Sequence, residues 1–172
     1  MNKYLTFIIF FSLVLKANCQ TKCNCEALID IEYKKEITLL EKPNGKIIKK
    51  LKHDFKNEDF LTLTIEKDSL GYFKVSLLYL VSAKEFKGWV KKNDHIGTFA
   101  RNYEPNKKLN LYSESNVNSK VKSTIEDWTN DLYIIEKCAG KWVYVKIKYN
   151  GKIFEGWLKP EMQCANPYTT CN

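Results

Sequence analysis

The sequence has few of the residues on which most catalytic and nucleic-acid-binding sites depend. Its 172 residues include 7 glycines, 2 histidines and a single arginine, Arg101. It contains no Gly-x-Ser-x-Gly, P-loop or Gly-x-Gly-x-x-Gly segment, so the common nucleophile and phosphate-binding motifs are missing. One arginine also argues against specific nucleic-acid recognition, which relies on bidentate guanidinium contacts.

The two histidines are poorly placed for catalysis or metal binding. His53 precedes Asp54 and His95 follows Asp94, each in a predicted loop and in a different part of the chain. We interpret both as solvated turn residues, because a nucleophile–base pair or a zinc site needs such groups clustered. The sequence therefore predicts no metal site, no cofactor and no enzymatic activity.

Long apolar runs are also scarce. The one clear run, residues 4–15, follows Lys3 and ends before Lys16. It is shorter than the roughly 20 residues that a membrane span needs, and its layout is typical of a secretory signal peptide. We expect cleavage between Cys19 and Gln20 and export to the periplasm or the extracellular space; the alternative is lipid attachment at Cys19.

The remaining chain contains an internal repeat. Ile65-Glu66-Lys67 matches Ile135-Glu136-Lys137 at an offset of 70 residues, and Gly88-Trp89-Val90 matches Gly156-Trp157-Leu158 at an offset of 68. Upstream, residues 39–51 correspond to residues 111–125. The chain after the signal peptide therefore contains two copies of one small unit.

Each copy has the periodicity of β-strands. Leu61, Leu63 and Ile65 alternate with polar residues, as do Val143 and Val145 with their neighbours. Turn sequences such as Asn150-Gly151 separate the runs. In the first copy we predict five strands, at residues 36–40, 47–51, 60–66, 71–80 and 86–91. An all-β fold with little or no helix follows.

Both copies resemble the bacterial Src homology 3-like domain. The resemblance depends on a first strand with a Pro/Ser/Asn turn, an aromatic-x-x-Val strand and a closing Gly-Trp-apolar strand. In the second copy these are residues 109–116, 142–145 and 156–158. The arginine common after the family's first strand is missing from both copies. The resemblance implies two tandem five-stranded barrels that bind peptide or wall polymer in exported bacterial proteins.

The predicted organisation has six segments. They are a signal peptide over residues 1–19, an N-terminal tail over 20–33, a first barrel over 34–97, a linker over 98–107, a second barrel over 108–164 and a C-terminal tail over 165–172.

Five cysteines follow the signal peptide, and an exported protein meets an oxidising environment. Cys138 and Cys164 stand where the first copy has Asp68 and Ile96, so we expect them to pair with each other. Cys171 is then expected to pair with Cys23 or Cys25, which leaves one thiol. Metal binding by Cys23-x-Cys25 is the less favoured alternative, since no second ligand pair lies nearby in the sequence.

The aromatic residues are the remaining candidates for a binding surface. Strand parity places Trp142 and Tyr144 opposite the apolar Val143 and Val145, and Trp128 lies in a polar loop. Exposed aromatic side chains are costly unless they are covered or used. The alternative is that they pack under a loop. Trp89 and Trp157 are interpreted as structural.

The sequence therefore predicts an exported, non-enzymatic binding module of the bacterial cell envelope. It would dock a peptide or a cell-wall polymer mainly through the second copy. A protein-protein interaction device, such as a periplasmic inhibitor or immunity protein, is the alternative.

Overall fold

The computed structural model describes residues 22–69, 71–104, 107–169 and 171. The predicted signal peptide and Cys19 lie outside these residues. Within the described part, no helix is both long enough and apolar enough to cross a membrane.

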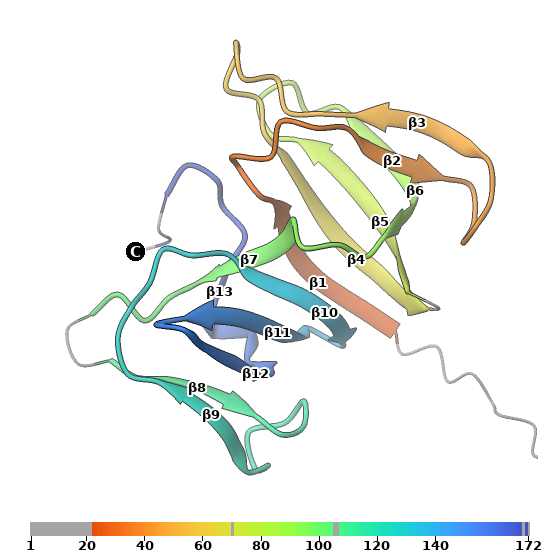
Figure 1. The fold of residues 1–172 in the computed structure, drawn as a ribbon. Coiled ribbons are helices and arrows are strands. Elements are labelled where there is room, and N and C mark those ends of the chain that lie inside the picture. The colour runs from red at the N-terminus through yellow and green to blue at the C-terminus, as the bar shows by residue number, and fades with distance from the viewer. Residues whose placement is uncertain (1–21, 70, 105–106, 170, 172) are drawn as a thin grey trace, which may run out of the picture.

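The described residues form thirteen β-strands, a single 3-10 helix and no α-helix, so the predicted all-β class is confirmed (Figure 1). In chain order the elements are β1 (Lys22–Ile29), β2 (Ile37–Leu40), β3 (Ile47–Leu51), β4 (Leu61–Ser69), β5 (Tyr72–Tyr79), β6 (Glu85–Lys91), β7 (Ile96–Ala100), β8 (Leu109–Tyr112), β9 (Val121–Ile125), β10 (Tyr133–Ala139), β11 (Trp142–Tyr149), β12 (Lys152–Leu158), the 3-10 helix η1 (Pro160–Met162) and β13 (Gln163–Cys164).

The strand order is symmetric about its centre when each strand is replaced by its counterpart in the repeat. It runs β3-β2-β6-β5-β4-β1-β7-β10-β11-β12-β8-β9, with β13 paired to β7 off this path. Each strand of the first half therefore has its repeat counterpart at the mirrored place, from β3 and β9 at the two edges to β1 and β7 in the centre. The two halves lie on either side of β1 and β7 in Figure 1. The internal repeat thus contains six strands in each copy.

The two central strands lie in segments expected to be a tail and a linker. Residues 20–33, the expected tail, contain β1, which pairs with β4 on one side and with β7 on the other. The end of β7 lies in the expected linker, and Gly97 of this strand pairs with both Leu28 and Ile134. One continuous antiparallel sheet joins the halves, and two separate five-stranded barrels are not confirmed.

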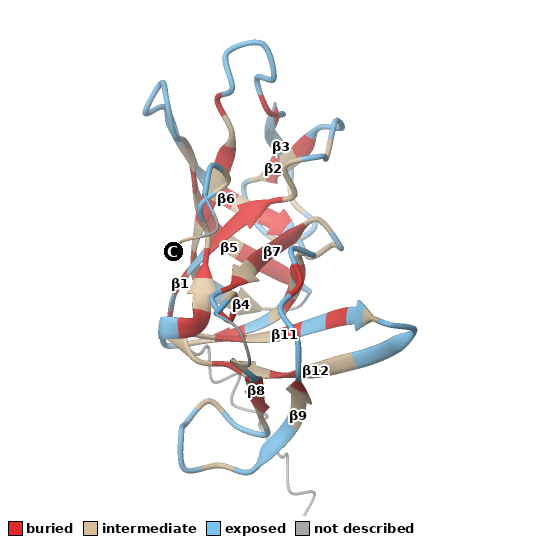
Figure 2. Ribbon diagram, turned by 90° about the vertical axis from the view of Figure 1, so that its left-hand side faces the viewer, coloured by how far each residue is buried: buried red, intermediate tan, exposed pale blue. Residues whose placement is uncertain are grey.

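Alternating side chains build the core along this sheet. In β4 the residues Leu61, Leu63 and Ile65 are buried while the intervening Thr62 and Thr64 are half-buried, and β11 repeats the pattern. Figure 2 shows the buried positions concentrated on the strands and the exposed ones at the loops. Gly97 is needed at the centre, because an added Cβ would lie 2.6 Å from the carbonyl oxygen of Tyr133.

A polar network also joins the halves beside the central strands. Lys92 Nζ lies 2.6 Å from Asp68 Oδ1 and donates to the carbonyl oxygen of Glu136 at 2.6 Å. The second oxygen of Asp68 accepts a hydrogen bond from the backbone N–H of Cys138 at 3.1 Å. Asp68 and Cys138 are equivalent positions of the repeat, so this contact joins the two copies at matching sites.

The cysteine pairing differs from the expected one. Cys25 is bonded to Cys138 and Cys164 to Cys171, so the expected Cys138–Cys164 bridge is wrong, as is the expected pairing of Cys171 with Cys23 or Cys25. The reason is the position of β1, whose Asn24 N–H donates to the carbonyl oxygen of Gly140 at 2.7 Å. This contact brings Cys25 against the end of β10, whereas Cys164 begins the C-terminal segment that contains Cys171.

Cys23 keeps a thiol in this arrangement. Its Sγ–H donates to the carbonyl oxygen of Cys138 at 3.1 Å. Burial, followed by the charge of Asp68, raises the pKa of the thiol to about 11. Cys23 is therefore protonated at neutral pH, and a protonated thiol is a poor nucleophile.

Candidate binding surface

Two of the three predicted site residues lie on the outer face of β11. Trp142 and Tyr144 are half-buried, and Val143 and Val145 between them are fully buried. This alternation follows from the two-residue period of a strand, with one face on the core and the other outward. The structure therefore places Trp142 and Tyr144 on a shared outward face, as the parity of the sequence predicted.

Neighbouring strands extend this face with two more rings. Tyr112 of β8 packs edge-to-face against Trp142 with 5.7 Å between ring centroids, and Trp157 of β12 packs against Tyr144 at 5.6 Å. Trp157 is also the pairing partner of Tyr112 across β12 and β8. We call Tyr112, Trp142, Tyr144 and Trp157 the aromatic surface. All four residues are half-buried, so each keeps part of its surface open to solvent.

Lysines flank the aromatic surface at Tyr144. The Nζ atoms of Lys122 and Lys137 each lie 5.1 Å from the centroid of the Tyr144 ring. Lys122 also donates to the Tyr144 hydroxyl at 2.6 Å and to Glu155 Oε1 at 2.7 Å. This hydrogen bond, donated by Lys122 and accepted by Glu155, holds the pKa of Glu155 below its usual range and raises the pKa of Lys122. Lys122 is thus paired, whereas Lys137 forms no ion pair among the described residues and lies beside the ring.

The first half has a different face at the equivalent positions. Tyr72, the counterpart of Trp142, is buried and donates to Asn44 Oδ1 at 2.7 Å. Lys74 stands where the second half has Tyr144 and pairs with Glu66. Trp89, the counterpart of Trp157, faces Lys74 and Leu40 across its neighbouring strands. Only one of these positions is both aromatic and partly open, so the aromatic surface belongs to the second half.

Trp128, the third predicted site residue, lies apart from the aromatic surface. It is in the loop between β9 and β10, and 39% of its side chain is exposed. Within the described residues it makes no ring contact. The structure therefore does not bring Trp128 together with Trp142 and Tyr144.

Sequence reasoning missed Tyr112 and took Trp157 as structural. A signal was available for both: Tyr112 ends a strand equivalent to β2, and Trp157 stands outward between the buried Gly156 and Leu158. Their convergence with Trp142 and Tyr144 depends on strand pairing across three strands, which no local pattern gives.

His53, which was expected in a solvated turn, and the nearby Asp59 are both buried and have structural roles. His53 is 2% exposed, accepts the Leu61 N–H at Nδ1 and lies 3.0 Å from the Asp30 carbonyl oxygen at Nε2. Asp59 is 6% exposed and accepts the backbone N–H groups of Val81 and Ser82. Among the described residues no three His, Cys, Asp or Glu side chains cluster as metal ligands.

Comparison with known proteins gives no family for this chain. Neither the protein-family models nor the curated proteins yielded a match.

Proposed function

We propose that this protein is an exported, non-enzymatic binding module that docks a cell-wall polymer through the aromatic surface. The observation that carries the proposal is the concentration of four partly open rings on one face of the second half. The equivalent face of the first half lacks three of them, so the fold alone does not require them there.

The chemistry of the surface suits a polymer of sugar rings. Aromatic side chains present large rigid apolar faces beside a polar handle, which matches ligands that are apolar on their faces and hydroxylated at their edges. Lys137, which forms no ion pair among the described residues, adds positive charge at Tyr144, and positive charge attracts anionic partners. We therefore favour a wall polymer that carries acidic groups over a neutral one.

The expected cellular location supports this proposal. Two disulfides are formed among the described residues, and disulfides persist in oxidising compartments outside the cytoplasm. The signal-peptide layout of the first 19 residues and the resemblance to exported Src homology 3-like modules point the same way. The two tandem five-stranded barrels that the resemblance implies are part of the proposal.

Co-sedimentation with purified cell-wall sacculi tests the proposal. We expect the protein without its signal peptide to sediment with sacculi, and Trp142→Ala and Trp157→Ala each to weaken binding by about tenfold, since truncating a central aromatic anchor typically costs 1.4 kcal/mol or more. Removal of the acidic polymer from the sacculi should weaken the sedimentation of the unmutated protein and of its variants alike.

The first half provides the matched control. Trp89→Ala removes a tryptophan from the strand position equivalent to Trp157 and should leave sedimentation unchanged. Failure of the unmutated protein to sediment, or an equal loss for Trp89→Ala and Trp157→Ala, would contradict the proposal. Urea unfolding of each variant shows whether the fold is intact.

A protein partner is the second candidate, and one observation favours it. Ile47 and Ile48 of the edge strand β3 are 57% and 54% exposed. An edge strand with exposed apolar side chains can accept a strand from another chain. Recovery of one stoichiometric envelope protein that is lost with Ile47→Lys, together with no sacculus binding, would favour this inhibitor or immunity role.

A further inference from the structure

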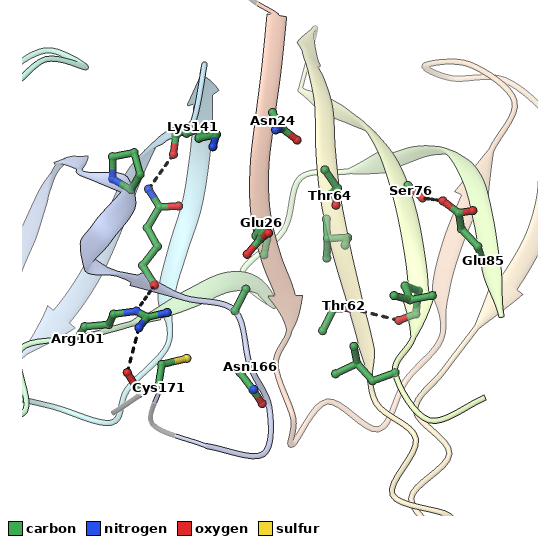
Figure 3. Close-up of a pocket in the computed structure, with 17 residues that line it drawn as sticks. Asn24, Glu26, Thr62, Thr64, Ser76, Glu85, Arg101, Lys141, Asn166 and Cys171 are labelled. Carbon is green, nitrogen blue, oxygen red and sulfur yellow. Dashed lines mark hydrogen bonds between the residues drawn. The ribbon is translucent and has the colours of Figure 1, made fainter. Parts of the chain in front are cut away.

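A groove lies between the sheet face of the first half and the C-terminal segment (Figure 3). Its volume is about 880 Å³. Asn24 and Glu26 of β1 and Thr64 of β4 line one side, and Arg101, Lys141 and Asn166 line the other. No aromatic side chain lines it among the described residues, and it shares no residue with the aromatic surface.

The second wall of the groove is fixed by several contacts. The disulfide between Cys164 and Cys171 closes the C-terminal segment into a loop. From this loop Tyr168 reaches the first half, where its hydroxyl donates to the carbonyl oxygen of Glu58 at 2.6 Å and its ring packs on Phe60 at 5.5 Å. A groove whose walls are already in place loses little conformational entropy on binding.

Arg101 in this wall is the only arginine among the 28 lysines and arginines of the chain. Its Nε donates to the Gln163 carbonyl oxygen at 2.8 Å and its Nη1 to the Cys171 carbonyl oxygen at 3.1 Å. These two bonds set the plane of the guanidinium, and three of its five N–H groups remain. A guanidinium held in one plane is suited to a carboxylate, which it can bind through two parallel hydrogen bonds.

Four charged residues line the groove, and three of them form no ion pair among the described residues; the fourth, Glu85, pairs with Lys87. Nine ion pairs are formed among the described residues, and neither Arg101 nor Lys141 takes part in any of them. On the opposite side Glu26 is exposed and also has no ion pair. The groove therefore has cations on one wall and an uncompensated carboxylate on the other.

We propose that this groove binds a short peptide with a free carboxyl terminus. Arg101 binds the terminal carboxylate, Lys141 adds positive charge on the same wall, and Glu26 attracts the amino group. The hydroxyls of Thr62 and Thr64 and the amide of Asn24 bond the peptide backbone, and Leu78 gives a small side chain an apolar contact. The opposed charges and the lack of rings for stacking favour a peptide over a sugar polymer.

Titration with tetra-alanine that has both termini free tests this proposal, with backbone amide NMR shifts as the readout. We expect saturable shifts at Asn24, Thr62 and Thr64. Tetra-alanine with an amidated carboxyl terminus should bind about tenfold more weakly, since it loses the charge-assisted hydrogen bonds that the carboxylate accepts from Arg101. The absence of saturable shifts up to about 10 mM, tenfold above a millimolar affinity, would overturn the proposal.

Variants locate the binding on the protein. Lys141→Gln should weaken the binding of free tetra-alanine several-fold. It leaves in place the hydrogen bond from Gln163 to the backbone carbonyl of residue 141. Arg101→Gln should weaken peptide binding more, although this substitution also removes the hydrogen bonds that hold the C-terminal segment. Lys148→Gln, an exposed lysine of β11 outside the groove, is the matched control and should change nothing. Equal binding of free and amidated peptide, or shifts that lie outside the groove, would contradict the assignment.

The peptide site and the aromatic surface are tested separately. Trp157→Ala should leave peptide binding unchanged, and Lys141→Gln should leave sedimentation with sacculi unchanged. The failure of either proposal therefore does not affect the other.

Discussion

At the scale of single residues, the alternation of side chains along a strand predicted which residues face outward, whereas position in a loop did not predict exposure. The outward placement of Trp142 and Tyr144 follows from the buried residues between them, so it could be predicted. His53 could not, because a histidine beside an aspartate in a turn is typical of a solvated loop. Its burial depends on the Asp30 carbonyl and the Leu61 N–H, which come from elements far apart in the sequence.

The burial of His53 predicts a pH dependence of stability. Loss of solvation lowers the pKa of His53 in the folded protein below its ordinary value of 6.5, despite the opposing effect of the Asp30 backbone contact. Near pH 6.5 and below, the unfolded chain then binds the proton more readily than the folded one, so stability falls as the pH decreases. We expect the urea midpoint to decrease from pH 7.5 to pH 5.5, above the range in which carboxylates titrate.

Substitution of each histidine checks the source of this dependence. His53→Gln should lower stability at every pH but flatten the decrease between pH 7.5 and 5.5. His95→Gln should keep the decrease of the unmutated protein, since His53 is then still present. A decrease of the same steepness in both variants would show that another group is responsible.

At the scale of elements, the sequence predicted the five strands β2 to β6 of the first copy close to their observed bounds but missed β1, β7 and β13. The predicted strand at 47–51 coincides with β3, for example. In β1 the alternation of Lys22, Cys23, Asn24, Cys25 and Glu26 is a strand signal, but the cysteines were taken as anchors of a tail. In β7 the central Gly97 argues against a strand. Glycine is needed there because the carbonyl oxygen of Tyr133 approaches closely.

The two disulfides are predicted to stabilise the fold unequally. The Cys25–Cys138 bond joins β1 to β10 across 113 residues, and the Cys164–Cys171 bond closes only 7. In the chain-entropy model a loop of roughly 100 residues contributes about 4.7 kcal/mol and a 15-residue loop about 3 kcal/mol. Urea unfolding should therefore show a larger loss for the Cys25→Ser, Cys138→Ser double variant than for Cys164→Ser, Cys171→Ser.

Peptide mapping of the unreduced protein checks the pairing itself. It should recover Cys25 with Cys138 and Cys164 with Cys171, and it should find the Cys23 thiol blocked only after unfolding. Double variants are needed because Cys23 lies beside Cys138 and can replace Cys25 in a single variant. A bridge between Cys138 and Cys164 in the map would contradict the strand arrangement around β1.

At the scale of the whole molecule, the two copies of the repeat share one sheet. The repeat itself could be predicted, because its matching segments recur at nearly constant offsets along the chain. The pairing of β1 with β7 could not, because only Leu28 with Gly97 and Ile29 with Ile96 define it, nearly 70 residues apart. Contacts of this kind leave no periodic signal in either segment.

The shared sheet predicts that the first copy is unstable when its boundaries are drawn from the repeat alone. A fragment of residues 34–97 lacks β1, so β4 would keep an unpaired edge and the buried Ile65 would lose its cover from Cys25 across the β1–β4 pair. We expect this fragment to show no cooperative urea transition by Trp89 fluorescence, since an open edge and an uncovered core remain. A fragment of residues 22–100 restores β1 and β7 and should regain a transition at a lower midpoint than the whole chain. A cooperative transition of equal midpoint in both fragments would mean that the copy folds without its central strand.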